Sequence, residues 1–519
     1  MQDVDVAIVG CGPTGATLGN LLAGRGHRIA LLDRATEIYP KPRAITADHE
    51  ALRAFQECGL AEEISAGAIA HPGTDYLGVR GQVIKRFYPL DSLPPLAWEP
   101  TFMFAQPELE AVLRRGLQHH GNARMMLGRE LLAYEQDDTG VSLRLDGGEL
   151  LRARYLLACD GGRSLVRKQA GVGVEDLAFD ENWIIIDAHL RGHTALPERC
   201  VQYCRPSRPG TYIVGPGLLR RWEIKMLPGE RPQDFETEAA LRRVLREFVD
   251  DSGLDIIRTA VYRFHALVAQ RWRDGRVFLL GDAAHQMPPF MGQGLCAGVR
   301  DAVNLAWKLD HVMRGAAGDA LLDSYEAERK PHAKTVVAHA KAFGLIIGEL
   351  DADRARQRDA RLEAELASGK AQTVRQHFIP DLAGGLIAME APGRPAQGAG
   401  ELFVQPWVFS GGSWSRLDDV MGFGFLLALR EPALLQALPR SLVEAWQALG
   451  GRHVVIGPAA LPERDGLFET WMKRHEAQAA IVRPDRYVYG TATDAAALET
   501  LLSRLLRSLA AQPCSLDVE

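Results

Sequence analysis

The sequence lacks three features: paired cysteines, an excess of basic charge and long apolar runs. Its seven cysteines are scattered and form no Cys-x-x-Cys pair, so we expect reduced thiols rather than a disulfide framework. The 60 Lys and Arg residues are outnumbered by 66 Asp and Glu, and a formal charge of -6 argues against a basic surface for nucleic acid or an anionic membrane. No stretch approaches the roughly 18 apolar residues of a membrane span, and the first apolar run is too short for a signal peptide. These absences predict a cytoplasmic protein with no nucleic-acid partner and no membrane partner.

What is present is the composition of a large globular enzyme. With 519 residues, 47% of them hydrophobic and 24% charged, the chain is long enough to bury several cores in two or three domains. His265 and His285 have no second ligand at a useful spacing, so we assign no metal site.

The first 33 residues are typical of a strand, a glycine turn, a helix and a second strand that ends in an acid. Gly10, Gly12 and Gly15 have the GxGxxG spacing, and Asp33 follows at about the 20-residue separation of a dinucleotide-binding βαβ unit. In such a unit the glycines admit the turn, the pyrophosphate and close packing of helix on strand, while the acid binds a ribose. Glycines also serve ordinary turns, but this context favours a dinucleotide site. The candidate residues are Gly10, Gly12, Pro13, Thr14, Gly15, Asp33 and Arg34.

A second glycine-rich stretch, residues 276–302, runs from an apolar strand into an acidic turn, two prolines, a glycine cluster and a helix. Gly281 allows a ligand to approach closely, and the Asp282 carboxylate can bind a polyol hydroxyl. Beyond Gly294 a helix points its positive N-terminal end back at this loop, where it stabilises an anion. A flavin has both a ribityl chain and a pyrimidine ring that becomes anionic on reduction, so we predict bound FAD. The candidate residues are Gly281, Asp282, Pro289, Gly292, Gly294 and Leu295.

The rest of the chain divides by composition. Residues 180–265 are short β-rich runs split by Pro and Gly turns, which favours an antiparallel sheet. Residues 388–401 are rich in Gly, Pro and Ala and predict a linker. Beyond it, strands alternate with helices, which indicates a separate small α/β domain.

Three motifs carry a family resemblance. GxGxxG at 10–15, ACDGGRSLVRK at 158–168 and GDAAHQMPPFMGQG at 281–294 resemble, in order and spacing, the FAD motifs of the single-component (class A) flavoprotein aromatic hydroxylases. Within that family, several segments are most similar to the 3-(3-hydroxyphenyl)propionate hydroxylases, among them PRAITADHEALR (42–53), GVRDAVNLAWKL (298–309) and RPDRYV (483–488).

The resemblance implies an α/β fold of three domains. These are a Rossmann-like FAD-binding domain of the p-hydroxybenzoate hydroxylase type, an inserted antiparallel-sheet substrate domain and a C-terminal thioredoxin-like α/β domain without redox cysteines. The boundaries it implies are residues 1–75, 105–180 and 265–385 for the FAD-binding domain, 76–104 and 181–264 for the substrate domain, and 400–519 for the C-terminal domain.

The same resemblance implies a monooxygenase reaction of aromatic catabolism. NADH or NADPH would reduce FAD, O₂ would add to form a flavin C4a-hydroperoxide, and its distal oxygen would hydroxylate a phenolic ring ortho or para to an existing hydroxyl. The implied substrate is 3-(3-hydroxyphenyl)propionate or a related phenolic acid. Members of the family are often dimers, so a homodimer is expected as well.

The resemblance also extends the set of site residues. Three further residues would contact FAD, although each taken alone is more often a surface or turn residue: Arg43, Gln106 and Asp160. At the substrate end, Asp48 is a candidate for polarising the substrate hydroxyl, and its alternative is the N-cap of a helix. Arg221 and Glu223 alternate on one strand and share one face, which could line the pocket or carry exposed charge. The remaining candidates for substrate contacts, whose alternative is a place in the core or a stiff loop, are Tyr203, Tyr212 and Pro288.

Two other classes of function fit part of the pattern, another flavin enzyme and a non-enzymatic binding protein. A halogenase-like flavin enzyme is disfavoured because a Trp-x-Trp-x-Ile-Pro stretch is missing, and a disulfide reductase because a redox cysteine pair is missing. A non-enzymatic prenyl-binding escort protein of the GxGxxG fold would not need the second site at 281–294. The colour of bound flavin in the purified protein separates the escort from the enzymes.

Overall fold

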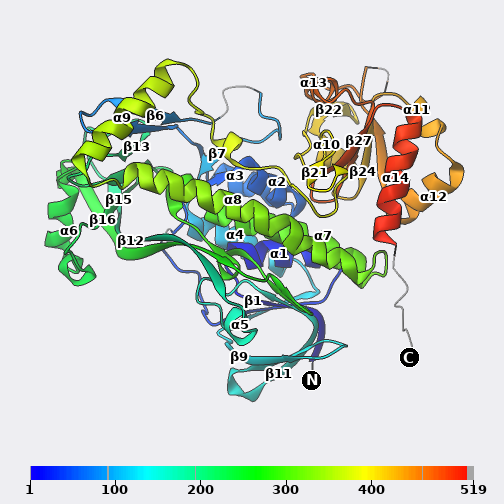
Figure 1. The fold of residues 1–519 in the computed structure, drawn as a ribbon. Coiled ribbons are helices and arrows are strands. Elements are labelled where there is room, and N and C mark those ends of the chain that lie inside the picture. The colour runs from blue at the N-terminus through cyan, green and yellow to red at the C-terminus, as the bar shows by residue number, and fades with distance from the viewer. Residues whose placement is uncertain (1, 42, 90–92, 193, 459, 511–519) are drawn as a thin grey trace.

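The computed structural model describes residues 2–41, 43–89, 93–192, 194–458 and 460–510. They build a mainly parallel sheet with its helices, a second and mainly antiparallel sheet, and a smaller C-terminal α/β unit (Figure 1). Cys514 lies outside these ranges, and the other six cysteines are unpaired thiols. Among the described helices, none is long and apolar enough to cross a membrane.

The first sheet is built around the predicted βαβ unit. β1 (Gln2–Val9), α1 (Pro13–Gly24) and β2 (Ile29–Asp33) follow in order, and the sheet has the strand order β17-β18-β11-β1-β2-β8. β11 (Leu150–Ala158) runs parallel to β1 and to β18 (Val277–Leu279), so the carboxyl ends of these three strands meet at one edge. Parallel α/β sheets bind ligands at this edge, and each of the three sequence motifs begins there. The other strands are β8 (Ala123–Leu127), β9 (Leu131–Gln136), β10 (Val141–Leu145) and β17 (Arg273–Asp274).

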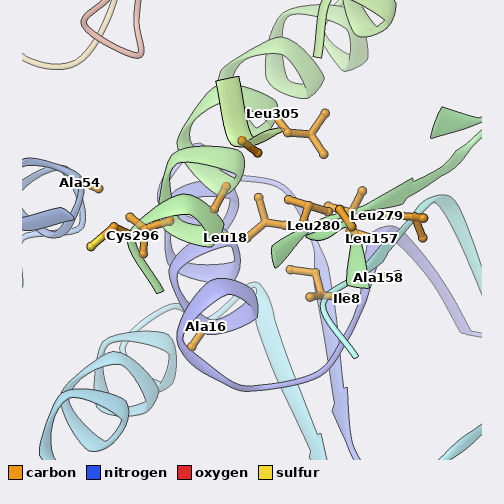
Figure 2. Close-up of a cluster of buried hydrophobic side chains, with 14 of the residues drawn as sticks. Ile8, Ala16, Leu18, Ala54, Leu157, Ala158, Leu279, Leu280, Cys296 and Leu305 are labelled. Atoms are coloured by element: carbon orange, nitrogen blue, oxygen red, sulfur yellow. The ribbon is translucent and has the colours of Figure 1, made fainter. Parts of the chain in front are cut away.

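Two helices pack against this sheet and against each other. α7 (Gly294–Met313) lies so close to α1 that a Cβ on Gly298 would fall 2.2 Å from Thr14 Oγ1. Figure 2 shows the apolar side chains between helices and sheet, including Leu18 of α1 and Leu305 of α7. Burial of this cluster holds the N-termini of both helices in place relative to the motif-bearing edge.

The second sheet has the strand order β19-β16-β12-β15-β14-β13-β5-β6. Its strands pair antiparallel, as predicted, except that β13 (Cys200–Tyr203) runs parallel to β5 (Thr74–Leu77). One face packs into an apolar core with α6 (Glu238–Leu245), and the other looks toward the motif-bearing edge of the first sheet. The other strands are β6 (Val83–Phe87), β12 (Val174–Leu190), β14 (Gly210–Val214), β15 (Leu219–Lys225), β16 (Leu254–Ala269) and β19 (His285–Gln286).

The C-terminal unit has a mixed sheet of order β25-β24-β26-β27, in agreement with the expected thioredoxin-like α/β domain. β24 (Leu426–Leu429) pairs parallel with β25 (Arg452–Val455) and antiparallel with β26 (Ala479–Val482). The sheet is completed by β27 (Val488–Ala492) and packed by α12 (Arg440–Ala448), α13 (Leu467–Arg474) and α14 (Ala495–Leu509).

Buried charge joins the C-terminal unit to the rest of the chain. Glu328 of α8 (Asp323–Ile347) binds Lys308 Nζ at 2.7 Å and Arg483 Nη2 at 2.7 Å, and all three side chains are fully buried. Burial acts to raise the pKa of the Glu328 carboxyl, but the two cations outweigh it and hold the pKa well below the ordinary value. Since loss of one partner would leave an uncompensated buried charge, this cluster fixes the two parts relative to each other.

Candidate active site

A cavity of about 500 Å³ lies between the motif-bearing edge of the first sheet and the inner face of the second. Gly12 at the start of α1 and Gly292 before α7 both line it. Two glycine-rich turns that are far apart in the sequence therefore open into one space. A single bound FAD requires this arrangement, because its two ends must reach both turns within one cavity.

The N-terminus of α1 is open to the cavity. Gly12 is its N-cap, no side chain caps the helix, and its first turn carries no acidic residue. A Cβ on Gly12 would meet no atom within 4 Å, whereas a Cβ on Gly15 would fall 1.9 Å from Gly10 O. Gly15 is thus needed to form the turn, while Gly12 leaves room beside a helix end that attracts anions such as a pyrophosphate. Pro13 and Thr14 complete this part of the lining.

Asp33 at the end of β2 supports the glycine turn. Its Oδ2 accepts a hydrogen bond from Cys11 N at 2.8 Å, and its Oδ1 accepts one from Ala35 N at 2.9 Å. The carboxylate is half-buried, Arg34 beside it is exposed, and neither belongs to the cavity lining. The ligand contacts expected of these two residues stay predictions.

The other end of the cavity is formed by the turn after β18 and the loop before α7. Gly281 donates its N–H to Asp301 Oδ2 at 3.1 Å. The next residue, Asp282, is exposed and lines the cavity, and the protein around the cavity raises the pKa of its carboxyl by desolvation. Gly292 has a φ of +63°, a backbone conformation that would be strained in a residue with a side chain. Gly294 begins a helix whose first turn has no acidic residue. The lining residues of this stretch are Asp282, Met287, Pro289, Phe290, Gly292, Gly294 and Leu295, and Pro288 is buried outside the lining.

Gln106 and Arg43 line the cavity as a linked pair. Gln106, the first residue of α4 (Gln106–Gln118), accepts from Ala44 N at 2.6 Å and donates to Glu110 Oε1 at 2.6 Å. Glu110 Oε1 also accepts from Arg43 Nη2 at 3.1 Å. Gln106 therefore holds the backbone next to Arg43 at the cavity wall.

Asp160 does not line the cavity itself, although both of its neighbours in the sequence do. It follows β11 and accepts from Val166 N at 3.2 Å, and burial raises the pKa of its carboxyl. Its neighbours Cys159 and Gly161 are the residues that line the cavity. Asp160 thus supports the turn that presents their backbone.

These features fit FAD. Two helix N-termini, both free of acidic residues in the first turn, open into one cavity together with the Asp282 carboxylate. A pyrophosphate would be held at the start of α1, a ribityl hydroxyl at Asp282 and an anionic pyrimidine ring at the start of α7.

Alternation along the strands of the second sheet decides which side chains face the cavity. Gln202, Thr211 and Glu223 line it, and Thr211 Oγ1 donates to Gln202 Oε1. Tyr203 and Tyr212 are each one residue further along, so both lie in the apolar core on the opposite face. The structure thereby corrects the expectation that these two tyrosines contact the substrate. The polar side chains of Gln202, Thr211 and Glu223 line the cavity instead.

Glu223 faces the cavity, but Arg221 is placed behind it. Burial raises the pKa of Glu223 to about 7, and Arg221, whose Nη1 lies 3.8 Å from Glu223 Oε1, offsets only part of this effect. Arg221 Nε donates to Asp187 Oδ1 at 2.6 Å, and Arg221 Nη1 donates to Arg43 O. The structure therefore corrects the expectation that Arg221 lines the pocket: it ties the second sheet to the segment that carries Arg43.

Asp48 also lies outside this cavity. It is the N-cap of α2 (His49–Glu57), where its Oδ1 accepts from Ala51 N at 3.2 Å, and its Oδ2 binds Arg300 and accepts from Gln293 Nε2 at 3.1 Å. Burial acts to raise the pKa of Asp48, but the Arg300 charge outweighs it and lowers the pKa. Asp48 lines a second cavity of about 420 Å³ between the C-terminal unit and the rest of the chain. The structure thus corrects the expectation that Asp48 contacts a substrate hydroxyl in the first cavity. Asp48 binds the side chain of Gln293 from outside that cavity.

Arg375 and His71 line the first cavity opposite the second sheet, and sequence reasoning missed both. His71 Nδ1 accepts from Gly73 N at 2.9 Å, so the proton of the neutral ring lies on Nε2, which is 3.3 Å from Arg375 Nη2. Burial and the Arg375 charge keep the pKa of His71 well below its ordinary value. Two donors, Arg375 Nη2 and His71 Nε2, therefore face each other, while Arg375 Nη1 donates to Met291 O. No motif marks either residue, and only the tertiary fold brings Arg375 to the site.

The fold and this cavity define a flavoprotein hydroxylase. Residues 3–340 match the FAD binding domain family and residues 400–508 match the HcaD C-terminal domain family. The chain belongs to the FAD binding domain family and is an FAD-dependent aromatic hydroxylase. The resemblance inferred from the three motifs is confirmed, and the escort-protein alternative is not favoured.

Particular relatives cover almost the whole chain. The sequence is 34% identical over 523 residues to the probable NADH-specific resorcinol 4-hydroxylase of Rhodococcus jostii (strain RHA1), with 98% of this chain and 96% of that protein covered. It is 34% identical over 512 residues to the 3-(3-hydroxy-phenyl)propionate/3-hydroxycinnamic acid hydroxylase 2 of Burkholderia vietnamiensis (strain G4 / LMG 22486), with 93% and 92% covered. Aklavinone-11 hydroxylase, solved with FAD and aklavinone, superposes with a TM-score of 0.79 at 28% identity over 98% of this chain and 99% of that chain.

Proposed function

We propose that the protein is an NADH-dependent hydroxylase of a small phenol whose oxygen is bound by Arg375 and His71. The observation that carries the proposal is the Arg375 guanidinium, which is buried at the cavity wall. It donates to Met291 O but forms no ion pair with a carboxylate of the described residues. A buried cation without a counterion is costly, and an anionic ligand would supply the missing charge. The relative named as an NADH-specific resorcinol hydroxylase supports both the phenol and NADH.

Arg375 and His71 would activate the ring by holding the phenol as its phenolate. A hydrogen bond to a charged group contributes about 1.5–3 kcal/mol, which corresponds to lowering the pKa of the phenol by about one to two units. Deprotonation raises the electron density at the ring positions ortho and para to the oxygen, and these are the positions that an electrophilic oxygen attacks. Bound FAD supplies the redox chemistry and the activation of O₂ with electrons from NADH.

Glu223, Gln202 and Thr211 would bind a second polar group of the substrate. These side chains lie on the inner face of the second sheet, and Glu223 can be protonated near neutral pH because burial raises its pKa to about 7. Hydrogen-bonding groups at two separate places on the cavity wall suit a 1,3-dihydroxybenzene such as resorcinol. A phenolic acid such as 3-(3-hydroxyphenyl)propionate is the second candidate, because its carboxylate would also satisfy the Arg375 guanidinium.

The remaining assignments concern FAD and location. Supported by the two open helix ends, we place the pyrophosphate at residues 12–15, the ribityl chain at Asp282 and the flavin ring against Pro289 and residues 292–295. A reaction that consumes NADH needs a compartment that supplies it, so we propose a cytoplasmic location.

The test compares substrates with the purified FAD-loaded protein. NADH oxidation, O₂ consumption and hydroxylated product are measured together for phenol, resorcinol and 3-(3-hydroxyphenyl)propionate. We expect resorcinol to give one product per NADH oxidised, and phenol, which lacks a second polar group, to give mainly hydrogen peroxide. Coupled turnover of the propionate alone would overturn the dihydroxybenzene assignment in favour of the second candidate. Peroxide formation without product for every compound would overturn the small-phenol proposal.

A further inference from the structure

We propose that the C-terminal unit positions the flavin loop through a buried hydrogen-bond chain that starts at Tyr487. The chain runs from Tyr487 through Glu50 and Arg300 to Gln293, which lies between two glycines of the FAD cavity. The inference rests on the FAD site proposed above, but it does not depend on the substrate. It gives the C-terminal unit, which contributes no residue to the lining of the first cavity among the described residues, a role in flavin binding.

The contacts are continuous. Tyr487 Oη donates to Glu50 Oε1 at 2.7 Å, and the other oxygen of Glu50 accepts from Arg300 Nε. Arg300 Nη1 then donates to Gln293 Oε1 at 2.9 Å, and its Nη2 binds Asp48. Each donor in the chain thus meets an acceptor, from the segment before β27 to the segment before α7.

The chain ends at Gln293, between two glycines that line the FAD cavity. Gln293 is only 1% exposed and is the N-cap of α7, yet its side chain makes no capping hydrogen bond. Its amide is held instead by Arg300 and by Asp48, which accepts from Gln293 Nε2 at 3.1 Å. Gly292 and Gly294 on either side line the FAD cavity. A shift of the Gln293 side chain would therefore move the backbone N–H groups expected to face the pyrimidine ring.

The Tyr487 hydroxyl affects the balance of charge around Arg300 because it donates a hydrogen bond to Glu50. Two carboxylates, the buried Asp48 and the partly buried Glu50, share the single guanidinium of Arg300. The Tyr487 hydroxyl relieves this shortage by donating to Glu50, which leaves Arg300 free to hold Asp48 and Gln293. Without that hydroxyl, Glu50 would compete more strongly for Arg300 and loosen its hold on Gln293.

Other contacts across the same boundary do not reach the loop. Arg53 Nε binds Asp418 Oδ2 at 2.7 Å, and Gln56 Nε2 donates to Gln405 Oε1 at 3.0 Å. These contacts hold the C-terminal unit in place whether or not Tyr487 keeps its hydroxyl. The effect on the flavin loop can therefore be separated from attachment of the domain.

The experiment compares Tyr487→Phe with Tyr489→Phe in the full-length protein. Both variants remove one phenolic hydroxyl from a buried tyrosine of the same segment, but Tyr489 packs inside the C-terminal unit. The readouts are the dissociation constant of FAD from the reconstituted apoprotein, the visible spectrum of the bound flavin and the melting temperature of the apoprotein. None of them requires a substrate, so failure of the proposed reaction would not affect the result.

We expect Tyr487→Phe to weaken FAD binding by about 5-fold or more and to shift the flavin spectrum, at an apoprotein melting temperature matching that of Tyr489→Phe. Glu50→Gln removes the competing charge, so its FAD affinity should stay near that of Tyr489→Phe. For the same reason, the loss caused by Tyr487→Phe should vanish in the double variant Tyr487→Phe/Glu50→Gln. FAD affinity and spectrum equal to those of Tyr489→Phe would overturn the proposal. Fully additive effects of the two substitutions would also overturn it, because they would show independent roles.

Discussion

Replacing Arg375 by Met is the most informative perturbation of the site. Met can still pack against the Phe87 ring, whose centre lies 4.7 Å from the guanidinium carbon. It removes the charge, the donors that face His71 and the hydrogen bond to Met291 O. If Arg375 binds a phenolate, the variant loses a charged hydrogen bond of about 1.5–3 kcal/mol, which predicts a fall in kcat/KM of about 10- to 150-fold. The pH at which turnover reaches half its maximum should rise by about one to two units, because the bound phenol then ionises less readily.

The assay is coupled product formation as a function of pH, together with the FAD content and melting temperature of each variant. Lys85→Met is the matched control, because the Lys85 ammonium lies 5.6 Å from the centre of the Phe343 ring in the same aromatic cluster, outside the cavity lining. The control should keep the wild-type pH profile. A pH profile of Arg375→Met that overlays the wild type, at equal FAD content, would refute the assignment of Arg375 to the phenolate.

Three further predictions test the flavin and substrate ends of the cavity. Asp282→Ala should weaken FAD binding by about 10-fold through loss of the ribityl contact; flavin absorbance after gel filtration measures this, and unchanged occupancy would contradict it. Gly15→Ala should strongly destabilise the fold, since its Cβ would fall 1.9 Å from Gly10 O. Gly12→Ala should leave the free energy of unfolding of the apoprotein within about 0.5 kcal/mol of wild type, but the variant should bind FAD poorly. Urea unfolding and FAD titration separate the two effects. The pKa of Glu223 is raised from 4.5 to about 7, so the folded state holds an extra proton between these values and loses stability as the pH rises through them. In Glu223→Gln the difference in melting temperature between about pH 5 and pH 8 should therefore shrink, and an unchanged difference would show that Glu223 titrates normally.

The FAD side of the site could be predicted from the sequence because it depends on local backbone geometry. A strand, a glycine turn and a helix follow one another within 24 residues at Gly12, and the same kind of pattern recurs at Gly292. Such turns carry their own signature, since glycine positions report positive φ angles and close approaches that other residues cannot tolerate. The order of the three motifs likewise indicated the family and the parallel sheet.

The substrate side could not be predicted, because it depends on which side chains the fold brings together from distant segments. Neighbouring residues of a strand point to opposite faces, and the sequence does not show which face lines the cavity. Thr211 faces the cavity, whereas Tyr212 lies in the apolar core. The sequence predicts Asp48 as either an N-cap or a site residue, but only the tertiary structure shows that its second oxygen binds Arg300 and Gln293.

The sequence by itself determined the cofactor, because helix ends and glycine turns are encoded within short stretches of chain. The resemblance of its three motifs to a known family indicated the class of reaction. The tertiary structure alone decided that Arg375 meets His71 across about 300 residues and that Tyr487 connects to the flavin loop. Contacts of that separation arise when segments distant in the sequence pack together, and no local pattern of residues records them.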